Sequence, residues 1–407
     1  MANRRKKHPV WRWILLLLVL AACYTHRAQI VSFFRDRTDL SVEAAKHAET
    51  ADEPEKEASD GVAYSAIPDT EEEVQDGYYY RKLEEDEQTL YKEILRGVRD
   101  KERVIEVGET DTEVVGKVYQ FLLYDRPELF WCTGEMTITS YVFSAELEPV
   151  YTWTGAELEK RQQKLEAAVE RCLSGITTDA SDYQRVKYVF RYLVDTVDYD
   201  LSAENNQTLY SALVGGKSVC AGYSKAAQYL LQKLGIPCIY VTGTAEGGDH
   251  AWNIVKCNGR YYQMDVTFGD PTFAGAQNTP SNINYAYLCC TDEDLYRNHT
   301  PSDIVELPEC KAEDLDYYVL HDRYYSAYDR DAILHEMNQS IEEREESFDC
   351  KFATKQLFQE ARDDLVENLL PQAARNLAGW YGLSSGRYSY VVDDTFYTIT
   401  VYWEYEN

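Results

Sequence analysis

The sequence is short of positive charge. Its 407 residues include 41 lysines and arginines but 70 aspartates and glutamates, which gives a formal net charge of −29 at pH 7. A protein that binds nucleic acid needs basic side chains to neutralise phosphates, and an acidic surface repels them. Nucleic acid is therefore excluded as an expected partner, and the composition suits a soluble protein surface instead.

Metal-binding motifs are also lacking. Neither a Cys-x-x-Cys pair nor a His-Glu-x-x-His sequence occurs in the chain, and both spacings are typical of metal sites. The ten cysteines follow no regular spacing. This excludes the dense disulfide framework of small secreted domains but leaves isolated bridges open. We therefore expect no metal site and no cofactor.

What the sequence does contain is a cysteine at the start of a predicted helix. Apolar residues recur at helical spacing over 221–234, and Gly235 followed by Pro237 predicts the helix end. Ser218 is the expected N-cap, which puts Cys220 in the first turn. The partial positive charge of a helix N-terminus favours thiolate over thiol, and its free N–H groups can form an oxyanion hole. Cys220 is therefore a candidate nucleophile.

A histidine and an aspartate can be placed by counting along a predicted hairpin. Asn258-Gly259 predicts a two-residue type I′ turn, which fixes the register of the flanking strands. In that register Trp252 faces Asp265. Two residues further along, His250 faces Thr267. Because side chains alternate between the faces of a strand, His250, Trp252 and Asp265 share one face. His250 and Asp265 are then diagonal neighbours, about 7–8 Å apart between backbones, a distance that their side chains can bridge.

These residue types match the needs of nucleophilic acyl transfer. A cysteine thiolate attacks a carbonyl, a histidine moves the protons, and a carboxylate holds the imidazole in the right tautomer. Aspartate is disfavoured in strands, so Asp265 needs a reason of this kind. Cys220, His250 and Asp265 are therefore the predicted catalytic residues, and Trp252 beside them is a candidate substrate contact.

Three segments resemble the bacterial transglutaminase-like superfamily, which has a papain-like cysteine fold. They are Gly-Lys-Ser-Val-Cys220-Ala-Gly-Tyr-Ser, Gly-Asp-His250-Ala-Trp-Asn and Tyr-Tyr-Gln-Met-Asp265-Val-Thr, and the strong match covers about residues 181–300. The resemblance implies that Cys220 is the nucleophile, His250 the general acid and base, and Asp265 the orienting carboxylate. It also implies an α+β fold, in which the helix bearing the cysteine packs on an antiparallel sheet bearing the histidine and the aspartate.

Three further positions in this region carry weaker signals. Phe268-Gly269 stands before Asp270-Pro271, where relatives often have Trp-Asp, and we expect this change to touch the pocket wall rather than the three catalytic residues. Gln207, in the loop before Cys220, is either a papain-like oxyanion glutamine or a plain loop residue. His299 lacks any motif context and is assigned a structural role.

Residues 1–24 are predicted to be a signal or membrane anchor. A basic stretch over 1–12 precedes a short apolar run over 13–22. Leu20-Ala21-Ala22-Cys23 resembles a bacterial lipoprotein signal box, in which Cys23 becomes lipidated. The alternative is an uncleaved single-pass anchor whose basic end is cytoplasmic. Both interpretations predict that the remaining chain lies outside the cytoplasm beside a membrane.

Four regions are predicted to follow this anchor. Residues 25–77 form an acidic disordered linker, because 12 acidic and only 2 basic side chains fall within 41–77. Residues 78–180 form a small α+β unit, 181–300 the catalytic core, and 301–407 a second α+β unit. Two capping boxes, Thr110-x-x-Glu113 and Ser181-x-x-Gln184, predict the starts of helices. In the last region, Pro371 interrupts a predicted helix over 355–378. A terminal hairpin is predicted to pair 388–392 with 396–403 around Asp393-Asp394.

The predicted function is that of a membrane-attached, extracytoplasmic cysteine enzyme acting on an amide. Cys220 attacks the carbonyl, His250 protonates the leaving amine, and the resulting thioester is resolved by water or by an amine. Water gives a peptidase or amidase, and an amine gives protein crosslinking. The predicted substrates are peptides or proteins, cell-wall peptides among them. The alternative is a non-catalytic surface binding module that keeps the fold.

Overall fold

The computed structural model describes residues 77–270 and 283–406. The predicted anchor with Cys23 and nearly all of the acidic linker lie outside the described residues, so both stay predictions. Within the part that is described, no helix combines the length and the apolar character needed to cross a membrane.

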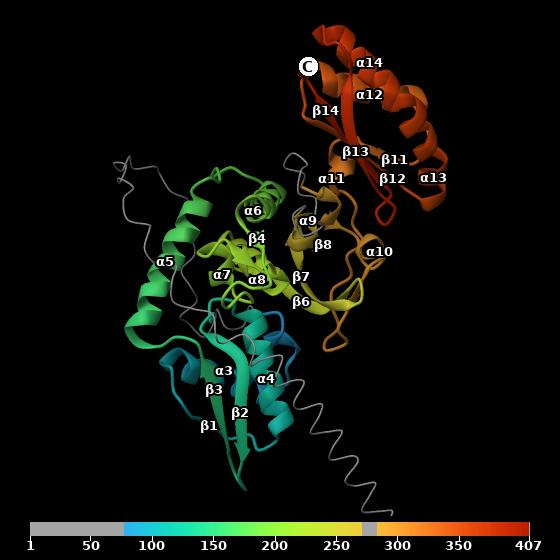
Figure 1. The fold of residues 1–407 in the computed structure, drawn as a ribbon. Coiled ribbons are helices and arrows are strands. Elements are labelled where there is room, and N and C mark those ends of the chain that lie inside the picture. Colours follow the sequence, from blue (N-terminus) through green and yellow to red (C-terminus); the bar gives the residue numbers. More distant parts are fainter. Residues whose placement is uncertain (1–76, 271–282, 407) are drawn as a thin grey trace, which may run out of the picture. The chain divides into compact units, whose positions relative to one another are not determined.

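A small α+β arrangement comes first in the described chain. Its elements are η1 (Tyr80–Lys82), α3 (Glu85–Asp100), β1 (Ile105–Val107), α4 (Thr112–Asp125), β2 (Cys132–Ser140), β3 (Ala145–Tyr151) and α5 (Gly155–Leu173). The strands form an antiparallel sheet in the order β1-β3-β2 (Figure 1). Asp111 caps α4 by accepting from the N–H of Glu113, so the capping box predicted at Thr110 is wrong by one residue.

The elements that carry the predicted catalytic residues come next. They are α6 (Asp182–Thr196), β4 (Asp198–Tyr199), α7 (Leu209–Leu213), β5 (Lys217–Ser218), α8 (Cys220–Lys233), β6 (Cys238–Ala245), β7 (Gly248–Cys257), β8 (Arg260–Met264), α9 (Val266–Gly269), η2 (Tyr285–Tyr287), β9 (Leu288–Cys290), α10 (Asp292–Leu295) and β10 (His299–Pro301). The capping box of Ser181 and Gln184 opens α6, as predicted. Five strands form an antiparallel sheet in the order β10-β6-β7-β8-β9, and β4 pairs with β5. Helix α8 packs against β6 and β7, which confirms the predicted α+β class with a cysteine-bearing helix on an antiparallel sheet.

The hairpin register is confirmed over most of its length. Asn258 and Gly259 both have positive φ, 51° and 80°, as a type I′ turn requires. Pairing runs from Cys257 opposite Arg260 to Asn253 opposite Met264, as counted. There the strand ends, because the Asp265 side chain accepts from the N–H of Phe268 and starts α9. The predicted pairing of His250 with Thr267 is therefore wrong, since Thr267 is helical.

The last elements surround a further sheet, which has four strands. They are α11 (Tyr317–Leu320), β11 (Tyr324–Tyr325), α12 (Arg330–Glu342), β12 (Ser347–Phe352), α13 (Lys355–Asp364), η3 (Leu365–Leu369), α14 (Leu370–Tyr381), β13 (Arg387–Asp393) and β14 (Thr398–Glu404). The strand order is β11-β12-β14-β13. The interruption predicted at Pro371 is a π-helical turn, η3, just before it. The terminal hairpin is confirmed, but Asp393 pairs with Thr398, so Asp393 belongs to the strand and the turn is formed by the four residues 394–397.

One buried lysine links this four-stranded sheet to the preceding region. Lys351 on β12 donates to Asp294 Oδ2 at 2.7 Å and to Asp316 Oδ2 at 2.8 Å. Its side chain is 3% exposed. Because Asp294 belongs to α10, the lysine fixes the C-terminal sheet against the segment that leads into β10.

Candidate active site

Helix α8 begins at Cys220, so the cysteine occupies the first turn, as predicted. Val219 is the N-cap, which corrects the prediction of Ser218. The Ser218 hydroxyl instead donates to the carbonyl of Asn206 at 2.6 Å and lies 2.8 Å from Ser211 Oγ. The hydroxyl expected to cap the helix therefore anchors the preceding loop to the helix start.

Tight packing holds the start of α8 in place. Nearly all residues from Ala221 to Leu231 are buried. Gly222 has no room for a side chain, because a Cβ there would lie 1.9 Å from Ser218 Oγ and 2.8 Å from the carbonyl oxygen of Thr208. A helix buried in this way positions Cys220 rigidly.

Cys220 also differs from the other cysteines in its exposure. All nine described cysteines are free, and eight of them are buried, whereas Cys220 is partly exposed. Burial raises the pKa of Cys132 and of Cys172 to about 12. Buried thiols of this kind are unreactive, so Cys220 is the described thiol that a substrate or reagent can reach.

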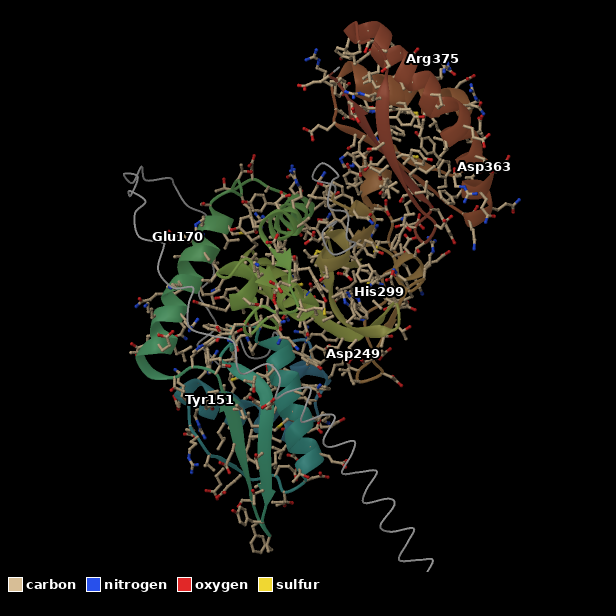
Figure 2. All side chains as sticks on the ribbon, in the orientation of Figure 1. Tyr151, Glu170, Asp249, His299, Asp363 and Arg375 are labelled. Carbon is tan, nitrogen blue, oxygen red and sulfur yellow. The ribbon has the colours of Figure 1, made fainter. Side chains whose placement is uncertain are left out.

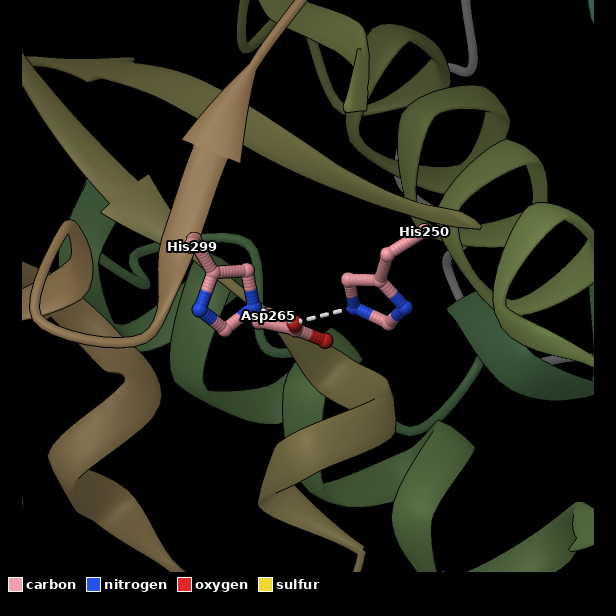
Figure 3. A group of neighbouring side chains, drawn as sticks. All are labelled: His250, Asp265 and His299. Atoms are coloured by element: carbon pink, nitrogen blue, oxygen red, sulfur yellow. Dashed lines mark hydrogen bonds and ion pairs between the residues drawn. The ribbon is translucent and has the colours of Figure 1, made fainter. Parts of the chain in front are cut away.

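His250 connects the cysteine to the aspartate. The ring lies on β7, and its Nε2 is 2.6 Å from Asp265 Oδ2 (Figure 3). Cys220 also favours the protonated ring, and because Nε2 faces Asp265, Nδ1 is the nitrogen left for the sulfur. Burial disfavours the charged ring, but the attraction of Asp265 and of Cys220 outweighs burial and raises the pKa of His250 to about 10. His250 is therefore an imidazolium at neutral pH.

Asp265 is completely buried and has a hydrogen-bond donor on each oxygen. Its Oδ1 accepts from the N–H of Phe268 at 3.1 Å, and its Oδ2 faces His250. Burial alone would favour the neutral acid, but His250 and His299 stabilise the carboxylate and hold the pKa of Asp265 well below its usual range. The residue is therefore an ionised, immobilised carboxylate, as an orienting role requires.

A second histidine reaches the same carboxylate. His299 on β10, which is labelled in Figure 2, places Nε2 2.9 Å from Asp265 Oδ2 and is only 1% exposed. The purely structural role assigned to it from sequence is therefore incomplete. No local motif marks it, because only the long-range pairing of β10 with β6, with His299 opposite Ala245, brings it to the site.

Trp252 does not present a surface to a substrate. Its side chain is fully buried, and its Nε1 donates to Gln263 Oε1 at 2.9 Å. The indole stacks near His250 with ring centroids 6.1 Å apart and meets His299 edge to face at 5.3 Å. The interpretation of Trp252 as a substrate contact is therefore wrong, because the ring packs behind the two histidines and supports them.

Phe268 contacts the catalytic group rather than a pocket wall. Its ring meets His250 edge to face at 5.1 Å and His299 at 4.9 Å. The expectation that the Phe268-Gly269 change touches only the wall is therefore wrong. Core packing leaves no room for a side chain at Gly269, because a Cβ there would lie 2.2 Å from the ring of Phe190.

Two aromatic side chains form an apolar wall next to Cys220. Tyr240 packs with Ala221 and Ala251, and Tyr124 of α4 lies against this cluster. Tyr124 and Tyr240 have ring centroids 5.2 Å apart. The N-terminal α+β arrangement thus reaches the neighbourhood of the cysteine, which no sequence pattern indicated. Gln207 is exposed, and its oxyanion role stays a prediction.

Three of these residues have the chemistry of metal ligands. His250, Asp265 and His299 bring one nitrogen or oxygen atom each within 4.8 Å of one another, and imidazole and carboxylate both bind zinc. The facing atoms are, however, joined at hydrogen-bonding distances of 2.6 and 2.9 Å. The geometry therefore fits a proton-bearing network that continues to Cys220.

The middle of the chain matches a known family. Residues 167–266 match the model of the transglutaminase-like superfamily. Kyphoscoliosis peptidase of Mus musculus is 25% identical over 144 residues, which cover 31% of this chain and 21% of the mouse protein. The Homo sapiens protein of the same name is 25% identical over 126 residues, covering 26% and 19%. The match thus spans about a fifth of the length of these curated relatives.

Two solved structures are also similar. One is described as a TGase, with 18% identity and a TM-score of 0.25, covering 33% of this chain and 44% of that one. The other is a protein from Cytophaga hutchinsonii proposed to be a cysteine protease, with 15% identity and a TM-score of 0.22, covering 32% and 61%. Residues 167–266 are thus a transglutaminase-like region, and the chain is distantly similar to kyphoscoliosis peptidase over that part of its length.

Proposed function

We propose that the protein is a cysteine-dependent enzyme that cleaves or transfers the acyl group of an amide in a peptide or protein. The series Cys220, His250 and Asp265 carries the proposal, because it combines a partly exposed thiol with an imidazolium that a buried, ionised carboxylate holds in place. The relatives named peptidase support a peptide or protein as substrate.

The first half of the reaction forms a thioester. The Cys220 sulfur, as thiolate, attacks the carbonyl carbon of the amide, and backbone N–H groups at the start of α8 stabilise the oxyanion. The C–N bond breaks as His250 passes its Nδ1 proton to the leaving nitrogen. Asp265 holds the ring throughout and stabilises its positive charge.

The second half resolves the thioester. Water or a primary amine loses a proton to His250 Nδ1 and attacks the carbonyl carbon, and the Cys220 thiolate leaves. Water yields a carboxylic acid, whereas an amine yields a new amide. The apolar wall of Tyr240 and Tyr124 is the proposed contact for the acyl side of the substrate, since exclusion of water at the sulfur favours the thioester.

Intact-mass trapping with candidate peptides tests this function. We expect a covalent acyl adduct on Cys220 during turnover and, when a primary amine is added, an amide product in place of part of the acid. Cys220→Ala should show neither adduct nor product. A chelator such as EDTA should change nothing, because the histidines are engaged in hydrogen bonds.

A folded wild-type protein that forms no adduct with any peptide or protein amide would contradict the enzyme and favour the binding module. An adduct on another cysteine would contradict the assignment of Cys220. Adduct loss after EDTA treatment would contradict the proton network and favour a metal at His250, Asp265 and His299.

The proposed location is extracytoplasmic and membrane-attached, with cell-wall peptides among the substrates, and it rests on the N-terminal sequence. Intact-mass measurement of the protein extracted from membranes is expected to give a chain that begins at Cys23 and carries added acyl mass. A chain that retains residues 1–22 contradicts lipidation and supports the single-pass anchor. Recovery of the full chain without membranes contradicts both.

A further inference from the structure

His299 makes more polar contacts with the site than packing alone requires. It occupies the side of the Asp265 carboxylate that His250 leaves free, and both rings direct Nε2 at the same oxygen (Figure 3). The two ring centroids lie 5.2 Å apart. Asp265 Oδ2 therefore has one histidine on the cysteine side and another on the interior side.

Both nitrogens of His299 face hydrogen-bond acceptors. Nε2 lies 2.9 Å from the Asp265 carboxylate, and Nδ1 lies 2.6 Å from Asn298 Oδ1. In the structure, the Asn298 Nδ2 donates to the Tyr287 hydroxyl at 3.1 Å, which leaves Oδ1 facing His299. Carboxylate and amide oxygens only accept, so with the Asn298 amide in this orientation both ring nitrogens face acceptors and each has a place for a hydrogen.

A positive charge at this position balances the site. A Cys220 thiolate and a His250 imidazolium are neutral as a pair, so the ionised Asp265 adds one negative charge at a fully buried position. An uncompensated buried charge is costly, and the protein as a whole carries a net charge of −29. A cationic His299 makes the group of four neutral.

The other groups that face His299 do not supply this charge. Asp265 at the end of β8 and His250 on β7 are part of the balance already. Tyr287 on η2 is the remaining titratable neighbour, and burial raises its pKa far above the usual range, so it stays a neutral phenol. The strand opposite, β6, presents Ala245.

The sequence makes room for β10 at one glycine. A Cβ on Gly243 of β6 would lie 2.1 Å from the carbonyl oxygen of Thr300 and 2.8 Å from the Trp252 ring. Only glycine therefore permits β10 to approach β6 closely enough to bring the neighbouring His299 to Asp265.

We propose that His299 is a positioning residue, protonated at both nitrogens, that holds Asp265 Oδ2 toward His250 and neutralises the buried group. The catalytic consequence rests on the function proposed above, whereas the protonation does not. His299 touches neither substrate nor sulfur and acts through Asp265.

Two variants separate the hydrogen bond from the charge. His299→Gln keeps an N–H donor near the position of Nε2 but is neutral, and His299→Phe keeps the ring packing and loses the donor. We expect His299→Phe to lower kcat about 10–100-fold, as loss of an orienting partner does, with KM nearly unchanged. His299→Gln is expected to recover most of that loss.

The charge is measured by the pH dependence of kcat/KM. Removing a cation next to Asp265 makes a proton on His250 harder to lose and a thiolate on Cys220 harder to form. Both limbs of the profile should therefore move to higher pH by about half a unit or more in both variants. Equal kcat losses with unmoved limbs would mean a packing role only and would overturn the proposal.

Nitrogen NMR of the full wild-type chain, labelled with ¹⁵N-histidine, tests the protonation without a substrate. The chain has 7 histidines, and the His299 signals are those missing from His299→Gln. We expect both nitrogens at imidazolium positions at neutral pH. One unprotonated nitrogen would overturn the proposal, even in an active enzyme. Imidazolium signals in a protein without amide turnover would instead refute the proposed function and leave the charge of His299 established.

Discussion

Asp265→Asn is expected to lower kcat by about 10³–10⁴-fold, because an amide can hold the imidazole in the wrong tautomer and does not stabilise its positive charge. Asparagine fills the same volume and can still accept from the N–H of Phe268, the bond that starts α9. Steady-state kinetics with the best substrate from the trapping experiment measures the loss. A variant within tenfold of the wild type would contradict the orienting role of Asp265.

The same substitution should change the pH dependence of the reaction and of stability. The raised pKa of His250 means that the folded protein holds this proton more tightly than the unfolded chain, where histidine titrates near its ordinary value of 6.5. The resulting contribution to stability is fully present below about pH 6.5 and is lost as the pH rises to about 10. In Asp265→Asn the alkaline limb of kcat/KM should move from near pH 10 toward the ordinary histidine range.

Asp265 makes the stability of the folded protein depend on pH in acidic solution. Its folded pKa is depressed, so its stabilisation is present above the ordinary aspartate range and is lost as the pH falls through the lowered value. Asp265→Asn should therefore flatten the stability profile on both sides, as measured by denaturant unfolding across pH. Parallel profiles for the variant and the wild type would contradict the ion pair with His250.

Lys351→Ala is expected to have the largest effect on stability. The lysine is buried between Asp294 and Asp316, at 2.7 and 2.8 Å. Burial alone would lower its pKa, but the two carboxylates outweigh burial and raise it above the usual range. Removing the ammonium leaves Asp316 without its cationic partner and Asp294 with Arg297 alone, and we expect a loss of about 3–5 kcal/mol in the free energy of unfolding.

A surface ion pair provides the matched control. Lys311 lies 2.8 Å from Glu309, and both side chains are 73% exposed, so Lys311→Ala should cost less than about 1 kcal/mol. Denaturant unfolding of both variants compares them. Because Asp294 also pairs with Arg297 at 3.0 Å, two residues before His299, Lys351→Ala should lower activity as well. Equal stability losses in the two variants would contradict the buried pairing.

The features that the sequence predicted are local ones. Periodicity and Gly235 located the helix of Cys220, and the Asn258-Gly259 turn gave the hairpin register up to Met264. The predicted register does not extend to Asp265, because its side chain accepts from the N–H of Phe268 and thereby caps a helix where the strand ends. The aspartate still reached the histidine, but as the last residue before α9 rather than as a strand neighbour.

The features that the sequence missed depend on long-range contacts. The pairing of β10 with β6 brings His299 to the site, and no local sequence pattern predicts this pairing. Tyr124 reaches the wall beside the cysteine from a separate helix. Trp252 looked available for substrate because it shares a face with His250, yet that face is the packed interior. Alternation along a strand identifies a common face but not whether solvent reaches it.

The pH dependence of Cys220 alkylation by iodoacetamide tests the central claim, that this thiol and His250 form a thiolate–imidazolium pair. In the wild type we expect rapid labelling of Cys220 at pH 7, because His250 is protonated there and the eight other described cysteines are buried. In His250→Ala, labelling at pH 7 should be slow and should rise only in alkaline solution. Identical profiles for the two proteins, each rising only above about pH 8, would contradict the pair and with it the proposed enzyme.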